Sequence, residues 1–109
     1  MRDASPGATD LREPPPLPEV RRIVLDALRG HDADVFLFGS WARGTPSRTS
    51  DIDVAILPRG ALPREILSLL RERLEESHVP QRVEIVNLAE GSDALRERVL
   101  LEGRRWTGS

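Results

Sequence analysis

The sequence contains no cysteine and no lysine. Without cysteine, the chain has neither a disulfide framework nor a thiolate metal site. All 16 basic residues are arginine, a usage that we attribute to coding bias in a GC-rich genome. Any cationic contact with a phosphate must therefore come from arginine, from a helix N-terminus or from a metal ion.

Long apolar runs and excess positive charge are also missing. No run approaches membrane-spanning length, and the N-terminus lacks the apolar core of a signal peptide. The formal net charge of -2 leaves no basic footprint, which argues against direct binding to nucleic acid. The two histidines, His31 and His78, have no partners at ligand spacing, so we expect no zinc site. These absences predict a cytoplasmic protein that binds neither a membrane nor nucleic acid.

The 109 residues divide into a tail and one domain. Residues 1–17 carry several prolines and few apolar side chains, which predicts a disordered or polyproline arm. Residues 18–109 remain for a single modest core of about 90 residues. Within them, helices are predicted to begin at Pro18, at Pro63 and at Ser92 or Asp93.

Short apolar runs between these helices predict strands. The predicted strands are residues 35–38, 51–57 and 82–88. A short helical turn is expected at residues 40–44, and the last helix should turn Leu95, Val99 and Leu100 inward. This order predicts an α/β (α+β) fold, with a small mixed sheet of three or more strands and helices packed on it.

Two carboxylates alternate along the second predicted strand. Asp51 and Asp53 are two residues apart, so both side chains point to the same face of the sheet. Like charges held that close repel one another unless a positive group lies between them. Carboxylate oxygens are preferred ligands of Mg²⁺, which usually also binds substrate phosphates. Asp51 and Asp53 are therefore candidate metal ligands.

A glycine–serine turn precedes the carboxylates at the end of an apolar run. Gly39 allows the backbone to approach a phosphate closely, and Ser40 offers both a hydroxyl and an amide. Arg43 lies in the same loop and could reach phosphates, although loop arginines are more often simply solvated. Ser50 is placed to orient the first carboxylate. Together these residues predict a metal-dependent nucleotide site.

The motif that these residues form resembles that of a known superfamily. Gly39-Ser40, a ten-residue spacer, and Asp51 with Asp53 give the pattern G-S-x10-D-x-D. This resembles the signature of nucleotidyltransferases related to DNA polymerase beta, over about residues 18 to 106. The chain is most similar to minimal nucleotidyltransferases, the MntA-like antitoxins that are paired with HEPN-domain toxins. The resemblance implies the palm-like nucleotidyltransferase core.

The resemblance also implies a third carboxylate and an activity. Glu84, on the third strand, would complete the metal-binding and catalytic set with Asp51 and Asp53, although many members carry aspartate there. The implied cofactor is Mg²⁺, with two ions and Mn²⁺ as a possible substitute, and the implied substrate is ATP. AMP would pass to a tyrosine of a HEPN ribonuclease in a hetero-oligomer. This chain has no tyrosine, so that modification would occur in trans.

Two other functions remain open at the level of sequence. The chain could neutralise a HEPN partner by occluding it, without any transfer. It could also be the catalytic half of a small-molecule transferase, such as one that acts on aminoglycosides. The short length argues against the last, and an intact set of carboxylates argues for catalysis over occlusion, because occlusion needs none of them.

Overall fold

The structure, a computed structural model, describes residues 13–47 and 49–107. Its centre is a four-stranded sheet with the order β3-β2-β1-β4. The strands are β1 (Ala33–Phe38), β2 (Ile52–Pro58), β3 (Val83–Asn87) and β4 (Arg104–Arg105). Strand β1 pairs antiparallel with β2 and β4, whereas β2 and β3 run parallel. The predicted mixed sheet is therefore confirmed, with a fourth strand that the sequence pattern did not indicate.

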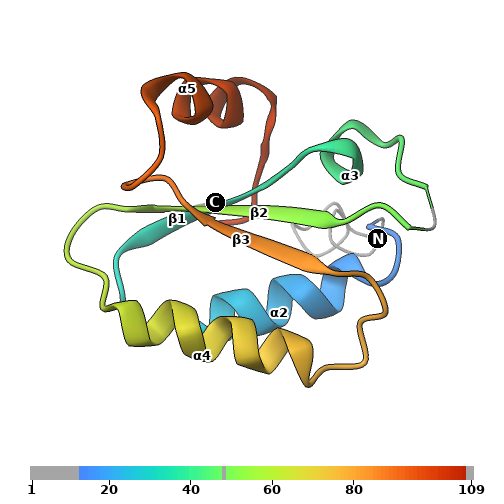
Figure 1. Ribbon diagram of the computed structural model, residues 1–109, viewed down its shortest axis with the longest axis horizontal. Helices are drawn as coiled ribbons and strands as arrows, with labels where there is room; N and C mark the ends of the chain where they lie inside the picture. The colour runs from blue at the N-terminus through green and yellow to red at the C-terminus, as the bar shows by residue number, and fades with distance from the viewer. Residues whose placement is uncertain (1–12, 48, 108–109) are drawn as a thin grey trace, which may run out of the picture.

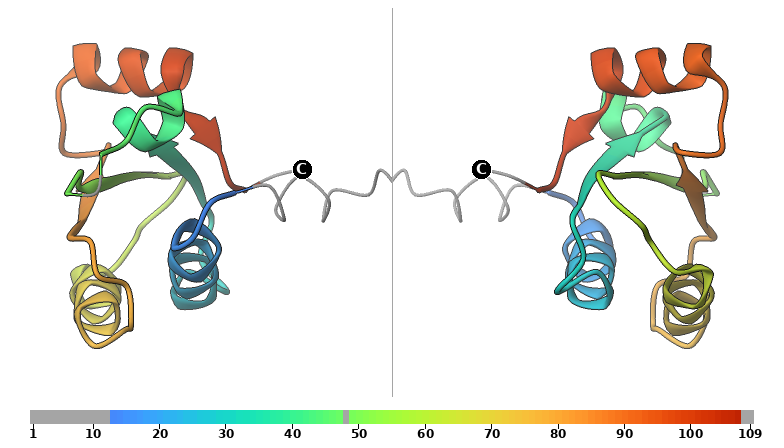
Figure 2. Two further views of the ribbon diagram at one scale, coloured as in Figure 1. Left: turned by 90° about the vertical axis from the view of Figure 1, so that its right-hand side faces the viewer. Right: turned by 90° about the vertical axis from the view of Figure 1, so that its left-hand side faces the viewer.

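Helices cover both faces of the sheet. Figure 1 shows α2 (Leu17–Ala27) and α4 (Arg64–Glu75) below the sheet, and α5 (Asp93–Glu102) above it. The short helix α3 (Ser40–Arg43) follows β1 directly, at one end of the sheet. The two side views of Figure 2 show the same three layers. None of the helices in the described part of the chain is long and apolar enough to cross a membrane.

The alternation of β2 divides the core into two clusters. Ile52, Val54 and Ile56 are fully buried, in the cluster that also holds side chains of α2 and α4. Ala55, between them, faces the other way and packs with Val99 of α5. Asp53 lies on that second face, because it is two residues from Ala55. The period-two pattern thus directs the carboxylate toward the side covered by α5.

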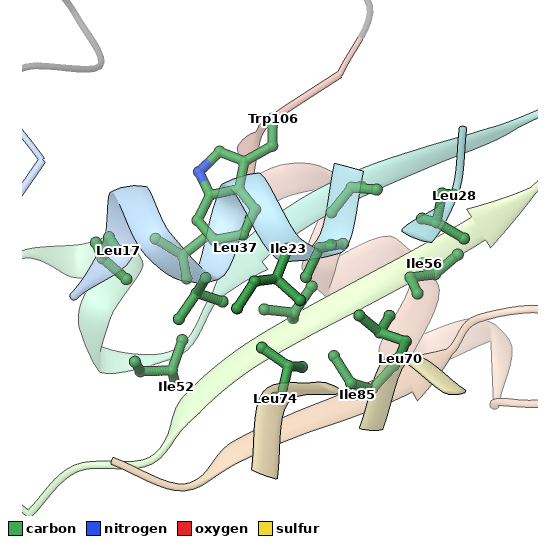
Figure 3. Close-up of a cluster of buried hydrophobic side chains, with 14 of the residues drawn as sticks. Leu17, Ile23, Leu28, Leu37, Ile52, Ile56, Leu70, Leu74, Ile85 and Trp106 are labelled. Atoms are coloured by element: carbon green, nitrogen blue, oxygen red, sulfur yellow. The ribbon is translucent and has the colours of Figure 1, made fainter. Parts of the chain in front are cut away.

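Both ends of the described chain enter the larger cluster. Trp106, directly after β4, is 5% exposed and packs among the side chains shown in Figure 3. Its indole nitrogen donates to Glu13 at 2.9 Å. Leu17 is 1% exposed and begins α2, so the core starts inside the segment predicted to be a tail. The apolar Leu17 follows three prolines, and burying it on the sheet offsets the ordering of the short segment before it. Residues 1–12 of the predicted tail lie outside the described residues.

The set of inward-facing residues on helix α5 differs from the prediction at one position. Leu95 is partly buried and Val99 is 1% exposed, as expected for the inward face. Leu100 was expected to face inward as well, but it is 49% exposed. Leu100 is five positions from Leu95, about 140° around the helix, so it falls outside the stripe that Leu95 and Val99 form. The helix begins as predicted, because the Ser92 hydroxyl accepts from the backbone amide of Leu95 at 3.1 Å.

Candidate functional site

The glycine–serine turn and the second carboxylate lie side by side. Antiparallel pairing places Phe38, the last residue of β1, opposite Asp53 in β2. Gly39 follows with a φ of 78°, a conformation that favours glycine. A Cβ atom at this position would collide with Oδ2 of Asp53. The site therefore requires glycine here both for the backbone conformation and for the close approach of the aspartate.

Trp41 and Ser50 hold together the loop between the turn and the carboxylates. Trp41 is 8% exposed, and its indole nitrogen donates to the backbone carbonyl of Ser50 at 3.2 Å. The Ser50 hydroxyl accepts from the backbone amide of Ser47 at 2.9 Å and also contacts the Ser47 hydroxyl. Trp41 thus packs as the sequence predicted, and the hydroxyl of Ser50 braces the loop through Ser47 instead of contacting the Asp51 carboxylate.

Three carboxylates influence one another at this end of the sheet. Asp51 is exposed and immediately precedes β2, while the parallel pairing of β2 with β3 sets Glu84 beside Asp53. Burial raises the pKa of the Asp53 carboxyl, and the negative charges of Asp51 and Glu84 raise it further. Arg43 acts in the opposite direction. The sequence-predicted acids therefore share one electrostatic environment, in which the charged form of Asp53 is disfavoured.

Glu84 is partly buried on β3, as its apolar neighbours in the sequence predicted. Its side chain is 45% exposed and pairs with Arg82 at 3.1 Å. Two residues apart on a strand, Arg82 and Glu84 share a face, which makes this pairing possible. The carboxylate is thus positioned beside Asp53 while its charge is balanced by an exposed arginine.

The carboxylates of Asp51, Asp53 and Glu84 are chemically suited to bind a hard divalent cation. Carboxylate oxygens are the ligands that such ions prefer, and a cation would offset both the burial and the neighbouring negative charges that raise the pKa of Asp53. Within residues 13–47 and 49–107, no three histidine, aspartate or glutamate side chains are already gathered as they would be around a metal ion. The donor set therefore fits, but its side chains would have to draw together on binding.

A cleft of about 370 Å³ opens between the turn and helix α5. Gly39, Ser40, Arg43 and Asp53 line one side of it. Its other wall comes from α5, through Leu95, Arg98, Val99 and Glu102, and Phe38 also contributes. The cleft thus gathers Gly39, Ser40, Arg43 and Asp53 on one concave surface, whereas Ser50, Asp51 and Glu84 are not among its lining residues. The α5 wall was not anticipated, because its residues lie more than forty positions beyond Asp53 and no local pattern links the two segments.

The comparison with protein families connects this arrangement to known proteins. Residues 32–106 match the family model described as "Polymerase beta, Nucleotidyltransferase". That range runs from just before β1 through β4 and includes the whole cleft. The chain belongs to this family. Its Gly39-Ser40 turn and its Asp51 and Asp53 pair are the residues by which sequence analysis predicted the membership.

Individual relatives of this nucleotidyltransferase are similar over much of its length. It is 33% identical over 75 residues to the protein adenylyltransferase MntA of Shewanella oneidensis, covering 69% of this chain and 53% of that protein. The chain thus spans about half the length of this curated relative.

Two solved structures share the fold. A toxin–antitoxin crystal structure with AMP-PNP has a TM-score of 0.66 at 28% identity, covering 82% of this chain and 73% of the other. A protein described as a minimal nucleotidyltransferase has a TM-score of 0.65 at 33% identity, covering 80% and 89%. These similarities extend the match beyond the motif to the layered arrangement of sheet and helices.

Proposed function

We propose that the protein is a Mg²⁺-dependent nucleotidyltransferase that transfers AMP from ATP to a hydroxyl group of another protein. The observation that carries the proposal is the meeting of Gly39, Asp53 and Glu84 at one end of the sheet, in a chain of this family. The named adenylyltransferase among the relatives, and the toxin–antitoxin structure with an ATP analogue, support adenylyl transfer as the specific reaction.

The reaction exchanges one bond to phosphorus for another. The acceptor oxygen forms a bond to the α-phosphorus of ATP, and the bond from that phosphorus to the oxygen bridging the β-phosphate breaks. Diphosphate leaves with the electron pair of that bond, and the hydroxyl proton passes to a carboxylate base. Glu84 takes this role in the proposal, because it lies beside Asp53 and its side chain is open to solvent.

The other residues of the cleft bind and orient the substrate. Gly39 and Ser40 form the seat for the β- and γ-phosphates, and Arg43 offsets part of their charge from the same side. Ser50 keeps the loop before Asp51 in place through Ser47. Asp51, Asp53 and Glu84 would hold Mg²⁺, or Mn²⁺ in its place. When bound, such an ion supplies neutralisation of charge on the phosphoryl oxygens.

The proposed acceptor is a tyrosine of a HEPN ribonuclease toxin, which AMP transfer would silence. The chain contains no tyrosine of its own, so the acceptor must lie on a partner. The toxin–antitoxin relative supports a toxin as the partner. The protein would then act as an antitoxin within a hetero-oligomer in the cytoplasm.

Thermal unfolding with and without nucleotide tests the site directly. ATP should stabilise the protein only when Mg²⁺ or Mn²⁺ is present, by about 2.7 kcal/mol at 100 times its dissociation constant. Asp51→Asn and Asp53→Asn keep the side-chain size but remove the metal-binding charge, so each should abolish that increment. Glu90→Gln, which removes an exposed carboxylate outside the cleft, is the matched control and should respond as the wild type does. A wild-type protein indifferent to millimolar Mg²⁺ and ATP would contradict the proposal.

A further inference from the structure

A triphosphate that enters this cleft meets the carboxylates of Asp53 and Glu102, which line it. A nucleoside triphosphate adds several negative charges, so its binding needs cations on the walls as well as at the carboxylates. Among the residues that line the cleft, those cations are Arg43 and Arg98. Arg43 lies beside the glycine–serine turn, and Arg98 lies across the cleft on α5.

Arg98 belongs to the stripe of α5 that faces the cleft. Leu95, Arg98, Val99 and Glu102 follow the spacing i, i+3, i+4 and i+7, which is one face of a helix. Val99 in this stripe is 1% exposed and packs on the sheet. The buried Val99 fixes the rotation of the helix, so the neighbouring Arg98 is directed to the cleft margin by packing and not by chance.

The end of α5 is held close to β1. A Cβ atom on Gly103 would come within 2.6 Å of the Val99 carbonyl oxygen and 3.1 Å of that of Leu37. Only glycine leaves room for this approach, after which the chain continues directly into β4 on β1. The helical turn that carries Arg98 therefore keeps a set position over the end of β1, next to the glycine–serine turn.

The guanidinium of Arg98 is placed to exchange one anionic partner for another. It pairs with Glu102 at 4.0 Å, at the limit of an ion pair, and its side chain is 71% exposed. Exposed pairs of this kind contribute little to stability, so a phosphate can displace Glu102 at little cost. A guanidinium can donate two parallel hydrogen bonds to a phosphate, which Glu102 at this distance does not receive.

We infer that Arg98 is a phosphate-binding residue that holds the β- and γ-phosphates of a nucleoside triphosphate from the α5 side of the cleft. Glu102 keeps the guanidinium over the cleft until the nucleotide enters. Arg98 faces the glycine–serine turn across the cleft, so it selects a triphosphate over a monophosphate. This inference rests on the proposed nucleotidyltransferase function and adds a residue from a helix that the motif does not include.

Calorimetric titration of the full chain tests the inference without any transfer reaction. With Mg²⁺ present, the wild type, Arg98→Gln and Arg98→Lys are titrated with AMP-PNP and separately with AMP. Arg98→Gln should weaken AMP-PNP binding by about tenfold or more, and AMP binding by much less, because AMP lacks the contacted phosphates. Arg98→Lys should restore part of the affinity, since it keeps the charge but not the planar fork.

Two further variants serve as controls. Arg104→Gln removes another exposed arginine, outside the cleft, and should bind AMP-PNP as the wild type does. Glu102→Gln releases Arg98 from its partner and should bind AMP-PNP at least as tightly. Circular dichroism checks that each variant is folded.

The outcomes separate the inference from the function on which it rests. If Arg98→Gln binds AMP-PNP as the wild type does, or loses AMP and AMP-PNP equally, Arg98 does not hold these phosphates, while the nucleotide site stands. If the wild type binds no AMP-PNP in the presence of Mg²⁺, the inference and the proposed function both fall.

Discussion

At the scale of single residues, Asp53 is the point where the glycine turn, the sheet and the other carboxylates meet. In the sheet, Asp53 pairs with Phe38 of β1, next to Gly39, on one side and with Glu84 of β3 on the other. Gly39 brings the backbone close to the Asp53 carboxylate, the strand position partly buries it, and Glu84 adds a like charge nearby. As a result, the charged form of the Asp53 carboxylate is disfavoured in the folded protein, so its protonation should have a measurable effect on stability.

Asp53→Asn should stabilise the protein at neutral pH, by about 1 kcal/mol, the usual scale for relieving unfavourable charge. The folded-state pKa of Asp53 lies above its unfolded value, so its penalty is present above the folded pKa. The penalty disappears as the pH falls through that pKa. Urea unfolding should therefore give equal stabilities for variant and wild type below the ordinary carboxyl pKa of 3.8. A variant less stable than the wild type at neutral pH would show that Asp53 makes favourable contacts instead.

Gly39→Ala should destabilise the fold by about 1–3 kcal/mol, because alanine is strained at this positive φ and its methyl group meets Asp53. Gly44→Ala is a matched control, since Gly44 has the same φ of 78° but open space where a Cβ would lie. Denaturant unfolding of both variants isolates the effect of the collision. Equal losses for the two would mean that the contact with Asp53 has no energetic consequence.

At the scale of elements, the predictable parts of the fold are those whose signal is local. The buried strands around Leu37 and Val54 and the stripe of α4 at Leu67, Leu70 and Leu74 appear as runs or periods in the sequence, and they occur where predicted. Strand β4 was missed, because two exposed arginines carry no strand signal and only pairing with β1 defines them. The position of α5 as a wall of the cleft was missed for the same reason, because no local sequence pattern signals it.

The segment after α5 holds both ends of the described chain to the core through Trp106. Trp106→Ala should cost about 3–5 kcal/mol, because it removes a large buried side chain. Trp106→Phe keeps most of the apolar contact and loses the bond to Glu13, so its cost should be smaller. Thermal or urea unfolding measures both. If Trp106→Ala unfolds like the wild type, β4 and Trp106 are dispensable additions to the sheet.

At the scale of the whole molecule, the fold gathers residues from distant parts of the chain around one cleft. The turn after β1 and Asp53 of β2 line one side of it and α5 lines the other, while Glu84 lies beside Asp53 on β3. The local spacing of Asp51, Asp53 and the glycine–serine turn made them candidates, whereas Glu84 was implied only by the family resemblance. The sequence could not predict that Glu84 would pair with Arg82, or which helix would face Asp53, since both depend on how the layers pack.

The central claim is that this protein modifies its partner covalently, and the mass of that partner tests it most directly. The purified chain, Mg²⁺, ATP and a HEPN ribonuclease partner are combined, and the partner is then separated and analysed by mass spectrometry. The account predicts a gain of one or more AMP units and ribonuclease activity that stays low after separation, since a phosphodiester persists without its maker. The double variant Asp51→Asn, Asp53→Asn should bind the partner without modifying it. If that variant inhibits as fully as the wild type and no mass gain appears, the protein acts by occlusion, and adenylyl transfer is contradicted.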